Sequence, residues 1–296
     1  MTNMKCESRN KLSENNLFNY AAGGVAGWGT YQATRTALRL PYSRYFRDGI
    51  SQISEAENKA LWDAAHDVFT TTNMSSKNIS MKDLSKLDAE KFANETVAKT
   101  SLKNKPRKKI WYYLFGETKS EKLRKHLKAV GEGNNACYIP WTKTVAINSE
   151  KMGFSAFHEM GHSLNHTGKG LGKHLHKSRH LAAAAVPFIL AYGLLTNKKE
   201  DAPFVDDKIG NFVKKNTGAL MFACMIPTLM EEGLASIKGA KLAKPKLSKD
   251  LYNKMCKSYA KAWGTYAVGA AAIGLCGAFA VYIRDKIVGN KKTRSI

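Results

Sequence analysis

The stretch FSAFHEMGHSLNH, residues 154–166, contains the pattern HExxH at His158, Glu159 and His162. Its apolar spacing predicts one helix from Met152 to about His166, directly after a predicted strand. On a helix, residues four apart lie on one face, so both imidazoles can reach one metal ion. Neutral imidazole is a good zinc ligand, and Glu159 can hold a zinc-activated water as general base. The stretch therefore predicts a zincin-like core with Zn²⁺ as cofactor and a peptide carbonyl as its target.

A catalytic zinc ion needs a third protein ligand and leaves one position for water. His166 lies two turns from His158, about 12 Å along the axis, which is too far for one ion. Better candidates are the adjacent acids Glu231 and Glu232, which are costly to bury at the end of an apolar segment without a charged partner. From the residues alone, either acid could be the ligand. Three further histidines are expected in a basic loop, facing solvent or lipid headgroups: His174, His176 and His180.

Short elements precede the HExxH stretch. Two β-type runs, Ala136–Ile139 and Thr144–Asn148, indicate a hairpin or a pair of edge strands. Such an edge strand can align the backbone of a peptide substrate. Helices are predicted at 54–70, where Ser54 and Glu57 form a capping box, at about 83–97 and at 120–130.

Three uncharged apolar segments follow the HExxH stretch: Leu181–Leu195, Gly218–Met230 and Ala262–Ile283. The third is long enough to span a bilayer, and the first two, each with one proline, are predicted to form a membrane hairpin. The flanking segments 167–180 and 231–261 are rich in lysine, which places them and the site on the cytoplasmic side. A single crossing by the third segment would put the basic tail outside, against this rule, so the number of spans stays open.

The composition narrows the function classes. Apolar residues make up 44% and aromatic residues 10% of the 296 residues, which excludes a disordered chain. The formal charge is +23, but the lysines are scattered and no nucleic-acid motif accompanies them. Anionic lipid headgroups are therefore the expected partners, and nucleic acid is not. The five scattered cysteines predict neither a disulfide framework nor a cysteine zinc site: Cys6, Cys137, Cys224, Cys256 and Cys276.

Three motifs resemble one family. They are Asn135-Ala136-Cys137 with Pro140, the HExxH at 158–162, and Glu232-Gly233-Leu234-Ala235-Ser236. They are similar to the edge strand, the zinc helix and the Glu-x-x-Ala-Asp motif of membrane-embedded gluzincin peptidases, which include the CAAX prenyl protease and the bacterial heat-shock membrane protease. The resemblance implies His158, His162 and Glu232 as metal ligands and Glu159 as general base. Ser236 stands where the family has aspartate, a residue that orients a ligand histidine.

The expected fold is mainly α-helical with a small β-hairpin or sheet, a zincin-like HExxH core and transmembrane helices. The expected function is a zinc-dependent endopeptidase that hydrolyses proteins or peptides at the membrane. The alternative is a non-catalytic membrane protein, either a degenerate peptidase or a scaffold, and Ser236 favours it. A third hypothesis is a soluble basic zincin, in which the apolar segments are core helices and do not cross a membrane. The predicted parts are an N-terminal segment with a weak interfacial helix (1–53), the helical region and zincin core (54–180), the membrane hairpin (181–230), the third-ligand segment (231–261), and a transmembrane helix with a basic tail (262–296).

Overall fold

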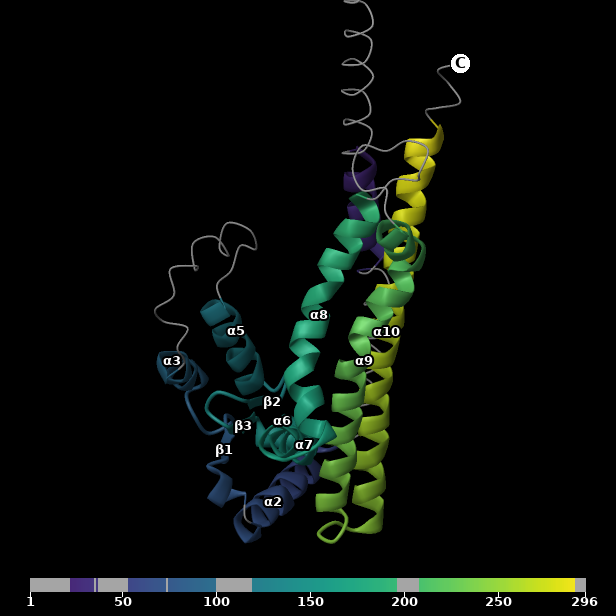
Figure 1. The fold of residues 1–296 in the computed structure, drawn as a ribbon. Coiled ribbons are helices and arrows are strands. Elements are labelled where there is room, and N and C mark those ends of the chain that lie inside the picture. The colour runs from purple at the N-terminus through teal and green to yellow at the C-terminus, as the bar shows by residue number, and fades with distance from the viewer. Residues whose placement is uncertain are drawn as a thin grey trace, which may run out of the picture. The chain divides into compact units, whose positions relative to one another are not determined.

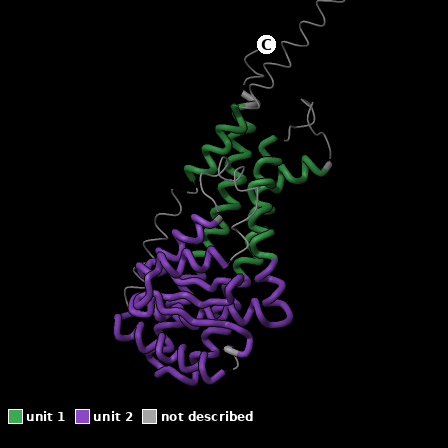
Figure 2. Tube along the Cα trace, turned by 90° about the vertical axis from the view of Figure 1, so that its left-hand side faces the viewer, with its two compact units in different colours: residues 1–46, 178–229, 264–296 green, residues 47–177, 230–263 purple. Residues whose placement is uncertain are grey.

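The computed structural model describes residues 22–34, 36, 53–72, 74–99, 119–195 and 208–290 (Figure 1). Over these residues the chain is mainly helical and contains one small sheet. Its contacts divide it into two compact units, which Figure 2 shows in different colours. We call residues 47–177 with 230–263 the HExxH unit, and residues 1–46 with 178–229 and 264–296 the helix unit.

The HExxH unit contains three strands in the order β1-β3-β2, formed by Ser80–Asp83, Thr144–Ile147 and Cys137–Ile139. β2 pairs antiparallel with β3, as the two β-type runs predicted, and Cys137 lies opposite Ala146. β1 pairs parallel with the other side of β3, and Ser80 lies opposite Thr144. The strand directly before the HExxH stretch is therefore central and fully buried, so the prediction of an edge strand is wrong for β3. Within the described sheet, β2 is the strand on the edge beside it.

The helix predicted to begin near Asp83 begins later. Ser80–Asp83 is β1, and α3 runs from Ala89 to Lys99. The Asp83 carboxylate accepts hydrogen bonds from Ser85 and from the backbone and hydroxyl of Ser149, so it fixes two turns. Asp88 accepts from the backbone N–H groups of Glu90 and Lys91, which is the geometry of a helix cap. The helix thus starts at the second aspartate.

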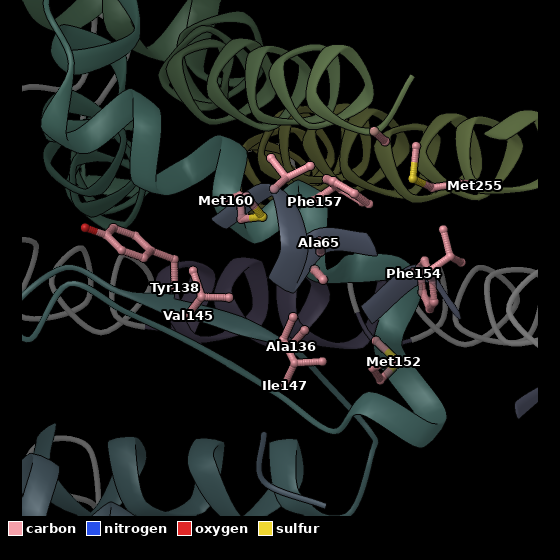
Figure 3. Close-up of a cluster of buried hydrophobic side chains, with 14 of the residues drawn as sticks. Ala65, Ala136, Tyr138, Val145, Ile147, Met152, Phe154, Phe157, Met160 and Met255 are labelled. Carbon is pink, nitrogen blue, oxygen red and sulfur yellow. The ribbon is translucent and has the colours of Figure 1, made fainter. Parts of the chain in front are cut away.

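The other predicted helices form close to their expected bounds. α2 spans Glu55–Thr71, and Ser54 and Glu57 exchange the two hydrogen bonds of a capping box. α5 spans Lys119–Gly131. α2 buries Leu61, Ala65 and Val68 in a core that β3 and the HExxH helix complete. Figure 3 shows this core around Phe154, Phe157, Met160, Val145 and Ile147.

The HExxH stretch itself is divided. α6 spans Ser149–Met152, a 3-10 turn spans Gly153–Ser155, and α7 spans Ala156–Thr167. The continuous helix predicted from Met152 is therefore broken before the motif. Asn58 of α2 explains the break, because its Oδ1 accepts the Phe154 N–H at 3.1 Å and its backbone packs directly on Gly153.

Two glycines bring α7 against α9, which spans Lys208–Ala243. A Cβ at Gly161 would overlap the backbone of Ala235, and a Cβ at Gly239 would lie 2.7 Å from the carbonyl carbon of Phe157. The two backbones thus approach more closely than side chains would allow. This approach sets Glu231 and Glu232 of α9 beside the HExxH face of α7.

The helix unit contains the apolar parts of α8 (Leu171–Leu195), α9 and α10 (Lys249–Asn290). All three helices are long and apolar enough to cross a membrane, which is consistent with an integral membrane protein, and each contains one of the predicted apolar segments. Small residues bring α9 and α10 together, since a Cβ at Gly218 would lie 2.6 Å from the Gly274 carbonyl oxygen. Large apolar side chains point away from the packed interior: Leu181, Phe188, Leu195, Phe212 and Leu275.

Three charged groups and the helix at residues 22–34 complete the description of the helix unit. Lys214 of α9 and Arg284 of α10 both contact the Asp285 carboxylate, at 2.7 and 2.9 Å. The predicted weak helix at 17–34 is helical over 22–34, and Tyr31 is buried with Leu194 and Ala280. The rest of segment 1–53, residues 196–207 and the residues after 290 lie largely or wholly outside the described part of the chain.

The close approach of α7 and α9 yields a test. Gly239→Ala should lower the free energy of unfolding by about 1–3 kcal/mol, because the added methyl forces the two backbones apart. Thermal unfolding of the detergent-solubilised protein measures the change. Gly264→Ala is the matched control, since a Cβ at Gly264 meets nothing within 4 Å. Equal melting temperatures for the two variants would contradict the tight crossing.

Candidate metal centre

Three side chains from two helices converge in the HExxH unit. His158 and His162 project from α7, and Glu232 projects from α9. The two Nε2 atoms are 3.0 Å apart, and Glu232 Oε2 lies 3.3 Å from His158 Nε2 and 3.5 Å from His162 Nε2. A tetrahedral ion with ligands at about 2.1 Å requires ligand atoms about 3.4 Å apart. The three predicted ligands are therefore spaced as one ion would need, and they are mostly buried.

Each histidine is held by a hydrogen bond on its other nitrogen. His162 Nδ1 lies 2.9 Å from Glu231 Oε1, and His158 Nδ1 lies 3.1 Å from Ser236 Oγ. A donor role for Nδ1 leaves the Nε2 lone pair directed at the site, which is the usual arrangement behind metal-binding histidines. Ser236 thus contacts Nδ1 of His158, the ring atom that an aspartate would contact if it oriented this histidine. Glu231 lies on the Nδ1 side of His162, away from Glu232, so the two adjacent acids occupy different places.

His176 is a site residue that the sequence reasoning missed. The prediction of a basic loop is wrong, because α8 begins at Leu171 and includes His174, His176 and His180. His176 is buried, and its Nδ1 lies 3.1 Å from Glu231 Oε1. The available signal was the absence of glycine and proline from Lys173 to Val186, which continues the apolar helix backwards to these histidines.

Glu231 is fully buried and is the centre of a hydrogen-bond network. The Nδ1 atoms of His162 and His176 and the amide of Asn165 all contact its Oε1, at 2.9, 3.1 and 3.1 Å. A buried carboxylate is tolerable when it is satisfied in this way. His162, His176 and Glu231 also form a second group that could hold a metal ion, besides the group of His158, Glu159 and His162.

Glu159 lies beside the two ring nitrogens and near the edge strand. It is 7% exposed, and it belongs to the His158 and His162 group, whose ligand atoms are all within 4.8 Å of one another. Burial and, secondly, the negative charge of Glu159 raise the pKa of Cys137 on β2. The charge of Glu159 is therefore felt at Cys137 on β2, which favours the neutral thiol.

Tyr259 of α10 is buried and packs against His158. Its hydroxyl donates to the Phe154 carbonyl at 2.8 Å, and its ring centroid lies 5.5 Å from that of His158. This buried hydroxyl fixes the turn that precedes α7. The tyrosine supports the helix, and its proton is committed to the backbone.

The pH dependence of metal binding follows from His162. Burial would lower its pKa, but hydrogen bonds to Glu231 and Glu232 outweigh burial and raise the pKa to about 10. Because this lies above the ordinary 6.5, the pairing stabilises the metal-free protein fully below about pH 6.5 and progressively less as pH rises toward 10. A bound metal ion must displace this proton. Affinity for a divalent ion should therefore rise about tenfold per pH unit between pH 6.5 and 8.5.

Competition with a chelator of known affinity measures this slope in detergent-purified protein. Glu231→Gln is the informative variant, because loss of the carboxylate lowers the pKa of His162 and flattens the slope at the upper end of the range. A wild-type affinity independent of pH would show that His162 is neutral without metal.

Comparison of the whole chain with family models, with curated proteins and with solved structures finds no match. The chemistry of the centre therefore rests on its own residues. Its buried histidine and glutamate groups could hold a metal ion.

Proposed function

We propose that this chain is a zinc-dependent endopeptidase that hydrolyses peptide bonds of proteins or peptides at a membrane. The observation that supports it most is the 3.0–3.5 Å spacing of His158 Nε2, His162 Nε2 and Glu232 Oε2, with Glu159 beside them. Two imidazoles and one carboxylate are a donor set that suits zinc, and three protein ligands leave a fourth position for water.

The residues divide the reaction between them. Zinc in this site would polarise the substrate carbonyl and lower the pKa of water toward about 7. Glu159 accepts the proton of the attacking water and then donates it to the leaving amine. Glu231 and Ser236 hold the two imidazoles in the orientation that directs Nε2 inward.

β2 supports the binding of an extended substrate. It lies at one edge of the described sheet, beside β3, and its Cys137 feels the charge of Glu159, so a chain added along that edge would lie on the side of the proposed base. The lysine-rich flanks of the apolar helices favour a site on the cytoplasmic side of the membrane. Substrates are then proteins or peptides at that surface, where anionic lipid headgroups attract the basic chain.

The alternative is a non-catalytic membrane protein that keeps the site as a relic or a structural element. It rests on Ser236 in place of aspartate. The 3.1 Å contact of Ser236 Oγ with His158 Nδ1 weakens that reason. A retained, buried Glu159 also favours catalysis, because a purely structural ion has no use for it.

Zinc content tests the ligand assignment. Wild-type protein purified in detergent should hold about one zinc per chain. Glu232→Ala should lose it, whereas Glu231→Gln should reach the same stoichiometry at saturating zinc with an affinity about 10–100-fold weaker. Loss of zinc from Glu231→Gln but not from Glu232→Ala would exchange the two roles. A wild-type protein without zinc, even when zinc is supplied, would support the non-catalytic alternative.

Glu159→Gln tests the reaction. The variant should keep its zinc and lose about 10²–10⁴-fold in the rate of cleavage of a fluorogenic casein, because the amide cannot accept the proton of water. Glu150→Gln is the matched control, since Glu150 is an exposed acid on α6, close in sequence to the motif. Equal cleavage by Glu159→Gln and wild type would refute the proposed mechanism.

A further inference from the structure

A basic pocket of about 520 Å³ lies in the HExxH unit. Its lining comes from the 3-10 turn at Ser75–Lys77, the β2–β3 turn, the end of α7 and the start of α8. Four of its eight lining residues are lysines and none is acidic: Lys77, Lys143, Lys173 and Lys177. None of the lining residues is a proposed metal ligand, so the pocket is a separate site.

Two turns with unusual backbone conformations form part of the pocket wall. Asn78 and Lys143 both line it, and they are the two non-glycine residues with positive φ in the described part of the chain, at 56° and 51°. The Lys143 ammonium group donates to the Lys77 carbonyl at 3.2 Å, and the Lys143 carbonyl accepts from the Ser80 N–H at 3.0 Å. These bonds join the two turns that form one wall.

The positive charge in the pocket has no acidic counterpart among the residues that line it. Across the residues that the structure describes, none of the four lysines forms an ion pair with a carboxylate. Burial, then His176 and the ammonium groups of Lys143, Lys177 and Lys173, lower the pKa of His166 on the pocket wall. Three lysines that line the pocket thus act on one partly buried ring, and an anion bound in the pocket would offset their positive charge.

The position of the pocket along α8 indicates where the anion comes from. Lys173 and Lys177 precede the uncharged segment that begins at Leu181, and four residues correspond to about 6 Å along a helix axis. α8 is one of the helices long and apolar enough to cross a membrane. Lysines just outside such a segment lie at the depth of lipid phosphates.

We propose that this pocket binds the phosphate-bearing headgroup of an anionic phospholipid. Its volume falls in the range of small-molecule sites, roughly 300–1,000 Å³, so it can enclose a headgroup. The inference requires membrane insertion but not peptidase activity.

Native mass spectrometry of the full chain, released from nonionic detergent micelles, tests this binding by titration with phosphatidylglycerol and phosphatidylcholine. Wild-type protein should bind the anionic lipid at least about tenfold more tightly. The triple variant Lys143→Gln, Lys173→Gln, Lys177→Gln should lose that preference. The control triple variant Lys82→Gln, Lys91→Gln, Lys128→Gln removes the same charge from exposed lysines outside the pocket and should keep it. An equal loss in both triple variants would show general charge attraction and overturn the proposal.

Competitors identify the source of the anion. Inorganic phosphate or glycerol 3-phosphate that displaces the lipid at equal concentration would overturn the lipid assignment in favour of a soluble phosphate. Displacement by a poly-glutamate peptide at lower concentration would overturn it in favour of an acidic protein segment. Glu232→Ala should bind lipid like wild type, so failure of the metal site and failure of the pocket are distinguishable. If the triple variant does not fold, Lys173→Gln, Lys177→Gln leaves the β2–β3 turn intact and should reduce the preference severalfold.

Discussion

The close approach of α7 and α9 is the constraint on which the HExxH unit depends. Gly161 and Gly239 allow the backbone of one helix to touch that of the other at Ala235 and Phe157. Because of this contact, the Glu232 carboxylate reaches the Nε2 atoms of both imidazoles. The Glu231 carboxylate reaches Nδ1 of His162. A larger residue at Gly161 or Gly239 would push α7 and α9 apart. The candidate ligands would then separate although none of them had been substituted.

Adjacent acids on one helix take different roles for a geometric reason. Successive residues of a helix point about 100° apart. Glu232 therefore faces the two Nε2 atoms while Glu231 turns toward His176 and Asn165. The two glutamates are chemically identical neighbours. Their different contacts come from the rotation of α9 about its axis relative to α7.

Local signals predicted much of the fold, and distant contacts decided the rest. The capping box of Ser54 and Glu57 located α2, and two runs of β-type residues located β2 and β3, because these signals lie within a few residues. β1 was missed because its partner residues lie 64 positions away in β3. His176 was missed because its burial depends on Glu231, 55 residues later. The histidines and the pair of acids could be predicted as candidate ligands from the residues, but only the family resemblance chose Glu232 over Glu231, and nothing local placed Glu231 behind His162.

The order of the donors along the chain has a consequence for biosynthesis. His158 and His162 leave the ribosome before α8, whereas Glu231 and Glu232 follow it, on α9. Glu231 comes 69 residues after His162. Between them the chain must complete one apolar helix and return along a second. A nascent chain therefore lacks part of the candidate metal centre until both helices have been made, so translation of the HExxH motif alone does not complete it.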